Sequence, residues 1–156
     1  MISFGIFIHY TRPFAYNRSM KVIVQNRRAY HDYHIKQIFE AGLVLTGKEI
    51  KAVRAGKVQL QGSYVKILSG DCYWVGGIIQ SGQDEQRTRR ILLHKKEIQS
   101  LTGTLEQTSV TAIPLKLYLK RNYAKLEIGI GVGKKAYDKR EAIKQRETDR
   151  KMRELL

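Results

Sequence analysis

The clearest alternation of apolar and polar residues lies in the carboxyl-terminal half of the chain. Residues 115–119 alternate leucine with lysine and tyrosine, and residues 124–130 alternate aliphatic residues with lysine, glutamate and glycine. Arg121 and Asn122 separate the two segments as turn residues. A period of two places alternate side chains on opposite faces of a strand. The pattern therefore predicts two antiparallel strands, each with one apolar and one polar face.

Three more segments have the composition of strands. Residues 64–67 alternate, and residues 72–79 are rich in aromatic and β-branched side chains. Ser69 and Gly70 lie between them and favour a turn, so we predict a hairpin. Residues 31–45 are largely apolar, but their alternation breaks around Gly42, which predicts a bulged strand.

Two short helices are predicted from local signals. Thr46 and Glu49 have the spacing of a capping box, in which each side chain accepts a hydrogen bond from the other residue's backbone N–H. This helix should begin at Thr46 and end near Gly56, because glycine is favoured just beyond a helix end. Helical spacing of Ile98 and Leu101 predicts a second helix over residues 94–101.

Strands separated by short helices favour a mainly β fold, because each helix needs a sheet face to cover. We predict an oligonucleotide-binding-like antiparallel β-barrel with short flanking helices and a basic carboxyl-terminal tail. We expect residues 26–133 to form this domain. Residues 1–25 should be a poorly ordered extension, with Met20 as a possible true start, and residues 134–156 should form the tail.

Charge narrows the range of partners. The chain has 29 lysine and arginine residues against 14 acidic ones, a formal net charge of +15. A pI near 10.0 favours a polyanion, with nucleic acid ahead of a membrane surface, since no apolar span or basic amphipathic helix is evident. The single cysteine, Cys72, excludes an intramolecular disulfide and a cysteine-rich zinc site. We expect a cytoplasmic protein that uses no cofactor and no metal.

The tail begins where a glycine-rich strand end gives way to charge. Residues 134–156 contain nine basic and five acidic residues and few apolar ones. Such a segment buries too little apolar surface to offset its ordering entropy, so we expect disorder until an anionic partner organises it. It contains no proline and has supportive pairs such as Glu147 with Lys151, so it can form a helix on binding. Tyr137 is available to stack on a base.

Two features inside the domain are candidate nucleic-acid contacts. Arg87, Arg89 and Arg90 form a basic cluster on a predicted loop, where three guanidinium groups suit a phosphate backbone; a role in solubility alone fits equally well. Glu40 lies among apolar residues and suits a carboxylate that accepts hydrogen bonds from a base or ribose. The alternative, which composition favours, is a rim residue paired with a lysine.

The enzyme alternative is a ribonuclease or an RNA-modifying enzyme. It would use His31, His34 or His94, and Cys72 would pair with His94 only by an accident of the fold. On a strand, His31 and His34 point to opposite faces and cannot chelate one metal without a third ligand. A structural or surface role is therefore favoured for the histidines, and we identify no catalytic residue.

Four motifs in this order resemble the SsrA-binding protein (SmpB) family, the protein partners of transfer-messenger RNA in bacterial trans-translation. They are NRRAYHDY at residues 26–33, FEAGLVLTGKEIKAVRAGK at residues 39–57, RTRRILLH at residues 87–94 and GKKAYDKR at residues 133–140. The resemblance covers about residues 26–146. It implies an oligonucleotide-binding barrel that grips the elbow of the tRNA-like domain of transfer-messenger RNA.

The resemblance also implies which positions contact RNA. Matching the motifs by position assigns six residues to the RNA face: Asn26, Tyr33, Glu40, Arg54, Leu92 and Lys125. The complete predicted RNA-binding set adds the basic residues of and near the same motifs: Arg28, Lys57, Arg87, Arg89, Arg90, Lys134 and Lys135. Together they offer a ring, a carboxylate, an amide, an apolar contact and cations for phosphates.

By the same resemblance, the tail enters the decoding centre and the empty mRNA channel of a stalled 70S ribosome. The implied contacts are Tyr137, Asp138, Lys139, Arg140, Ile143, Lys144 and Arg146. Elongation factor Tu would join through the RNA complex. Three departures stand against the family pattern: a short loop at residues 81–86, an aromatic extension before residue 20, and a tail that stops soon after Arg153.

Overall fold

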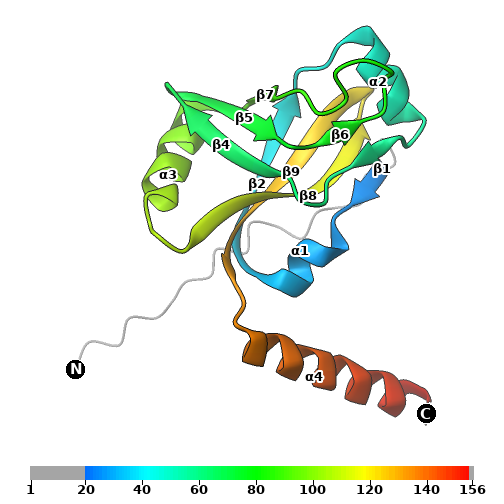
Figure 1. Ribbon diagram of the computed structural model, residues 1–156, viewed down its shortest axis with the longest axis vertical. Helices are drawn as coiled ribbons and strands as arrows, with labels where there is room; N and C mark the ends of the chain where they lie inside the picture. Colours follow the sequence, from blue (N-terminus) through cyan, green and yellow to red (C-terminus); the bar gives the residue numbers. More distant parts are fainter. Residues whose placement is uncertain (1–19, 155–156) are drawn as a thin grey trace.

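The computed structural model describes residues 20–154, except for the side chains of residues 136–139, 141 and 142. Antiparallel strands dominate it (Figure 1). The main sheet contains β1 (Met20–Gln25), β2 (Tyr33–Leu43), β4 (Tyr64–Leu68), β5 (Asp71–Val75), β7 (Arg89–Leu92), β8 (Val110–Lys120) and β9 (Tyr123–Gly133), while β3 (Val58–Gln59) pairs with β6 (Ile78–Ile79). The helices are α1 (Arg27–Asp32), α2 (Gly47–Arg54), α3 (Lys95–Leu105) and α4 (Ala136–Glu154).

Six strands form a near-closed ring. Their pairing runs β8–β4–β5–β7–β2–β9, and β9 pairs again with β8. The β4–β8 junction is the weakest, since its register consists of Val65 opposite Ala112. Strand β1 lies outside the ring as the outer neighbour of β8. The expected mainly β, antiparallel class with short helices is confirmed.

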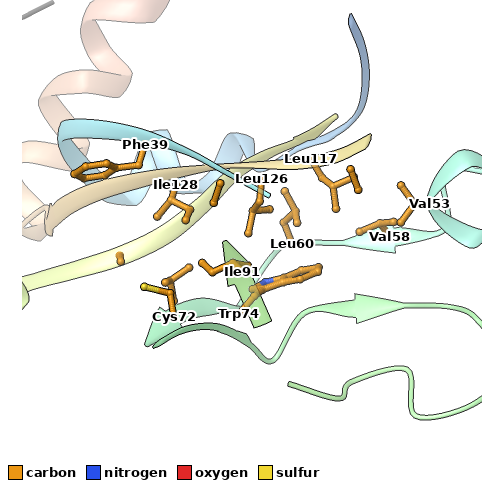
Figure 2. Packing of buried hydrophobic residues seen from close by; sticks show 14 of the residues in the cluster. Phe39, Val53, Val58, Leu60, Cys72, Trp74, Ile91, Leu117, Leu126 and Ile128 are labelled. Atoms are coloured by element: carbon orange, nitrogen blue, oxygen red, sulfur yellow. The ribbon is translucent and has the colours of Figure 1, made fainter. Parts of the chain in front are cut away.

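The main core fills the inside of this ring (Figure 2). Trp74, Leu117 and Leu126 are fully buried, and α2 and α3 contribute Val53 and Leu101. A smaller cluster packs Ala29 of α1 against Ile113 and Leu115. Both faces of β8 and β9 are therefore largely buried along their middle parts. The expectation of one polar face per strand was wrong there, because a register shift between Pro114 and Lys116 places Leu115 with Ile113 against α1, and Tyr118 of the expected polar face is fully buried.

The residues that mark helix ends and turns in the sequence predicted those features correctly. Thr46 caps α2 in the predicted capping box with Glu49, and Gly56 adopts φ +74° just beyond the helix. The hairpin joining β4 to β5 turns at Ser69–Gly70, and the hairpin joining β8 to β9 turns at Arg121–Asn122. All four turn residues have positive φ, the geometry that matches the twist of two-residue hairpins. The second predicted helix is α3, which begins after its N-cap, His94.

Three local expectations need correction. Residues 20–25 form β1 on β8, so this part of the expected poorly ordered extension is a paired strand; residues 1–19 lie outside the described part of the chain. Residues 27–32 form α1, capped by Asn26, before β2 begins. The irregularity of β2 lies between Ile35 and Gln37, and Gly42 pairs regularly. α1 has fewer than two turns, too few residues for a periodic pattern, and so the strand predicted over residues 31–45 includes its last two residues.

The tail forms α4, which leaves the end of β9 and extends away from the ring (Figure 1). Its apolar side chains Ile143 and Met152 are exposed. They do not supply a buried face, which agrees with the expectation that this helix does not dock firmly on its own domain. That the helix forms only on binding stays a prediction. Within residues 20–154, no helix is long and apolar enough to span a bilayer.

Candidate nucleic-acid interface

Strand register brings three of the predicted RNA contacts together around Gly42. Gly42 of β2 lies opposite Leu92 of β7 on one side and opposite Lys125 of β9 on the other. Glu40 lies two residues before Gly42, on the same face of β2. Leu92 is 53% exposed although it is apolar. We call Glu40, Leu92 and Lys125 the Gly42 cluster: one carboxylate, one apolar contact and one cation, drawn from three strands.

Glu40 is held by side chains that reach it from β8. The Tyr118 hydroxyl donates to one carboxylate oxygen, and Lys120 Nζ lies 3.2 Å from the other. Burial would raise the pKa of Glu40, but these two hydrogen bonds and the charges of Lys120 and Lys125 outweigh it, and the pKa is lowered. The expected pairing with a lysine is therefore present. The carboxylate is ionised and still 30% exposed, so it can accept further hydrogen bonds.

Neighbouring positions extend this polar face along the sheet. Glu127, opposite Glu40 in β9, is nearly buried and lies 3.5 Å from Lys116 Nζ. The hydroxyl of Tyr30 in α1 is 3.5 Å from the same carboxylate. Burial, together with the charge and hydrogen bonding of Glu127, raises the pKa of Tyr30 to about 12. These carboxylates thus have neutral phenols and cationic lysines as neighbours.

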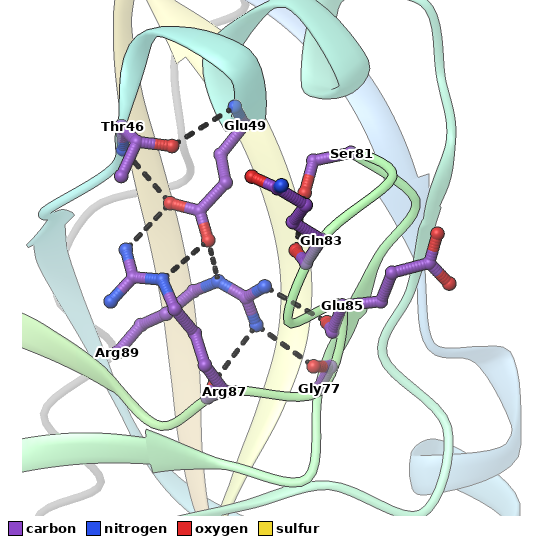
Figure 3. Close-up of polar contacts among 8 residues, drawn as sticks. All are labelled: Thr46, Glu49, Gly77, Ser81, Gln83, Glu85, Arg87 and Arg89. Carbon is purple, nitrogen blue, oxygen red and sulfur yellow. Dashed lines mark hydrogen bonds and ion pairs between the residues drawn. The ribbon is translucent and has the colours of Figure 1, made fainter.

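Two arginines of the predicted basic cluster, Arg87 and Arg89, converge on Glu49 (Figure 3). Arg89 is fully buried on β7, so its assignment as an RNA contact is corrected. Its Nε donates to Glu49 at 2.9 Å, and its two other nitrogens donate to backbone carbonyls including those of Gly77 and Glu85. Its guanidinium also lies 5.4 Å from the centre of the Trp74 ring. A group with this many internal partners is not available to phosphate.

Arg87 and Arg90 keep some exposure but have acidic partners. Arg87 donates two hydrogen bonds to Glu49, at 2.7 and 2.6 Å, and is 36% exposed. Arg90 donates to Asp71 at 2.7 Å and is 53% exposed. Burial opposes ionisation of Glu49, but the bonds from Arg87, Thr46 and Arg89 and the charge of Arg89 lower its pKa to about 2. Glu49 is thus an ionised carboxylate that binds two arginines, whereas the sequence indicated only its role as a helix cap.

A second group of predicted contacts lies at the other end of β2. Tyr33 begins this strand, and at roughly 3.3 Å per residue it is about 30 Å from Gly42 along the strand. Arg28 is exposed on α1, beside Asp32. Lys134 donates through its backbone N–H to Asp32 and through Nζ to the Tyr30 carbonyl. Lys135, which follows, is exposed. These residues therefore form a group separate from the Gly42 cluster, at the opposite end of β2.

Asn26 has a structural role at this second end. Its side-chain oxygen accepts from the Ala29 N–H, and its amide donates to the Pro114 carbonyl at 3.1 Å. The residue is only 8% exposed. Its assignment to the RNA face is corrected to that of a cap that fixes α1 on β8.

Other predicted positions are on solvent-exposed surface. Arg54 ends α2 and Lys57 follows it, and both are exposed. On α4, Arg140, Ile143, Lys144 and Arg146 are exposed. The side chains of Tyr137, Asp138 and Lys139 lie outside the described part of the structure, so those predictions stay as they were.

Two of the candidate histidines lie at helix ends in the described region. His31 Nδ1, in the last turn of α1, lies 2.9 Å from the Asp32 carboxylate, and His94 is the N-cap of α3. Residues 20–154 as described contain no group of three or more His, Cys, Asp or Glu side chains that could hold a metal. Cys72 is buried, and burial followed by the charge of Asp71 raises the pKa of its thiol. A buried neutral thiol is a poor nucleophile.

Sequence reasoning missed Tyr118 and Lys120 as partners of Glu40. A usable signal was present, because a two-residue turn at Arg121–Asn122 fixes Lys120 opposite Tyr123 and Tyr118 opposite Lys125. The pairing of β2 with β9, which brings Glu40 alongside, joins segments more than eighty residues apart and had no such local signal.

Comparisons with known proteins agree with these motifs. The family model described as SmpB protein matches residues 23–156. An SsrA-binding protein of Lysinibacillus sphaericus (strain C3-41) is 47% identical over 142 residues, 86% of this chain and 91% of the relative. One from Nostoc sp. (strain PCC 7120 / SAG 25.82 / UTEX 2576) is 44% identical over 148 residues, 90% of this chain and 96% of the relative.

A solved structure gives the same relationship. A chain in the structure named "tmRNA-SmpB: a journey to the center of the bacterial ribosome" matches with a TM-score of 0.65 and 41% identity, covering 79% of this chain and 94% of that one. On the family model, the relatives and the fold, the chain belongs to the SmpB family of SsrA-binding proteins.

Proposed function

We propose that this protein binds the tRNA-like domain of transfer-messenger RNA and delivers it to stalled ribosomes for trans-translation. Membership of the SmpB family makes it a non-enzymatic RNA-binding protein that acts with transfer-messenger RNA on the ribosome. The observation that carries the finer proposal is the Gly42 cluster, in which residues matched to the family's RNA contacts meet on one exposed surface.

The chemistry of this cluster suits a folded RNA. In our proposal the near-closed ring works as an oligonucleotide-binding barrel that presents the cluster to the RNA elbow. Glu40, held ionised by Tyr118 and Lys120, accepts hydrogen bonds from ribose hydroxyls or base edges. Leu92 contacts an apolar base or sugar surface. Lys125 and the exposed cations Arg54 and Lys57 bind phosphates.

The two ends of the molecule are proposed to have different partners. The domain formed by residues 26–133, together with β1, holds the RNA, and the tail of residues 134–156 enters the decoding centre and mRNA channel. Arg140, Lys144 and Arg146 provide exposed charge for that channel, and Tyr137, Asp138 and Lys139 keep the roles implied by their motif. Elongation factor Tu joins through the RNA, and the site of action is the cytoplasm.

A binding experiment tests the proposal and its enzyme alternative together. Purified protein should bind the isolated tRNA-like domain and leave the mass of that RNA unchanged over time. An excess of an unrelated hairpin RNA of equal length should compete poorly, because the elbow is recognised by shape. A time-dependent change in RNA mass would instead favour a ribonuclease or RNA-modifying enzyme, and the absence of binding would contradict the proposal.

A further inference from the structure

An open cleft of the described structure lies away from the Gly42 cluster, between α1, the start of β4 and the start of β8. It has a volume of about 470 Å³, within the ~300–1,000 Å³ range of ligand-binding clefts. Its walls include Arg28 and Tyr33 from the α1 side, Gln61 and Tyr64 from the β4 side, and Thr111 from β8. None of the motifs placed a binding site on the β4 side.

The lining combines the groups that recognise an unpaired nucleotide. Tyr64 is 44% exposed, and the Tyr33 ring, which also packs on the cluster beneath α1, lies on the opposite side of the cleft. Aromatic rings of this kind stack on bases of any identity. The exposed amide of Gln61 and the hydroxyl of Thr111 can bond base edges, and the guanidinium of Arg28 can bind a phosphate.

Charge around the cleft also favours an anion. Its carboxylate, Asp32, lies 3.3 Å from Arg28 Nε and 2.9 Å from His31 Nδ1, so its charge is partly compensated. Lys134 is fixed nearby, because it donates to the backbone carbonyls of Asp32 and Tyr30. A nucleotide phosphate entering beside Arg28 therefore meets a net positive surface.

Both walls are fixed by buried hydrogen bonds. On the α1 side, Asn26 bonds the Ala29 N–H and the Pro114 carbonyl. On the β4 side, the Ser63 hydroxyl donates to the Leu60 carbonyl and accepts from Trp74 Nε1. The Trp74 ring itself is tightly packed, because a Cβ added at Gly77 would lie 1.9 Å from a ring atom. A cleft with rigid walls loses little entropy when a ligand enters, which favours affinity.

We propose that this cleft binds an unpaired nucleotide of RNA, stacked against Tyr64 with its phosphate beside Arg28. The inference rests on the proposed function and adds a contact at the opposite end of β2 from the Gly42 cluster. The nucleotide can belong to transfer-messenger RNA or to ribosomal RNA, since both present the same base, ribose and phosphate. Tyr64 and Gln61 are the residues this proposal adds.

The test measures binding of Tyr64→Ala to two probes, the isolated tRNA-like domain and purified small ribosomal subunits. Loss of one base stack should weaken binding to one of them by roughly tenfold, while Tyr64→Phe keeps wild-type affinity. The probe affected identifies the source of the nucleotide. Tyr73→Ala is the matched control, because Tyr73 is on the same face of the neighbouring strand β5 but does not line the cleft.

A second variant guards against a folding defect in Tyr64→Ala. Gln61→Trp fills the cleft from an exposed position and removes no buried contact, so it should reproduce the loss with an unchanged unfolding midpoint. If Tyr64→Ala and Gln61→Trp both bind both probes with wild-type affinity, the proposal that the cleft binds a nucleotide is wrong, and the proposed function is unaffected. Failure of the wild-type protein to bind the tRNA-like domain would overturn the proposed function itself.

Discussion

Tyr118 is a buried residue that holds the carboxylate of a partly exposed one, Glu40. It is fully buried, yet its hydroxyl donates to the carboxylate of Glu40, the acidic member of the Gly42 cluster. Tyr118→Phe removes this charge-assisted bond and keeps the aromatic ring. We expect the free energy of unfolding to fall by about 1–2 kcal/mol, and the affinity for the tRNA-like domain to fall severalfold. Urea denaturation and RNA titration measure the two effects.

The effect should depend on pH in a defined direction. The pKa of Glu40 is lowered from its ordinary value of 4.5, so its bonds stabilise the fold above that pH and are lost as the carboxylate is protonated. The difference between Tyr118→Phe and the wild type should therefore shrink as the pH falls below 4.5. Tyr123→Phe is the control, because that phenol is 72% exposed in the same hairpin. Equal losses from both variants would contradict the assigned role.

Glu49 connects one element to several others. It caps α2, and it also joins that helix to β7 and to the loop before it, through Arg89 and Arg87. Glu49→Gln leaves the buried guanidinium of Arg89 without its carboxylate, at a cost of about 3–5 kcal/mol in unfolding free energy. With the pKa of Glu49 lowered to about 2, this stabilisation is present above the unfolded value near 4.5 and is lost as the pH falls toward 2.

Glu97 offers a control of matched geometry. Its side chain accepts a hydrogen bond from the His94 backbone N–H at the start of α3, as that of Glu49 does from Thr46, but on an exposed helix end. Glu97→Gln should cost no more than about 1 kcal/mol, with little change in acid sensitivity. Unfolding curves at pH 7 and pH 3 compare the two variants. If both lose the same stability at pH 7, the buried arginine is not what makes Glu49 costly to replace.

Elements with a local signal were predictable, and elements defined by packing were not. The capping box located α2, and the turn residues located both hairpins, because those signals lie within four residues of the feature they set. The burial of Arg89 could not be predicted in this way. Three arginines in a polar stretch indicate exposure, and only the fold shows that a glutamate and backbone carbonyls surround one of them. The same holds for Asn26, whose partner Pro114 is 88 positions away.

At the scale of the whole molecule, charge and shape are distributed unevenly. The tail carries nine basic and five acidic residues, so it contributes +4 of the net charge of +15, and the other residues contribute +11. The ring, with α1, α2 and α3, has its own buried core, to which the exposed apolar residues of α4 do not contribute. Most of the net positive charge therefore lies outside the tail, and so does the buried core formed by the described side chains.

Removal of the tail should consequently separate the two activities. A chain ending at Gly133 should retain most of its affinity for the tRNA-like domain and lose tagging on stalled ribosomes. Its affinity should still fall with salt, at a log–log slope of roughly −0.7 to −0.9 per phosphate contact. A chain ending at Lys135 keeps the two bonds of Lys134 to α1 and separates loss of the helix from disturbance of the cleft. If both truncations weaken RNA binding as much as they weaken tagging, the tail grips the RNA, and the division between the two ends of the molecule is wrong.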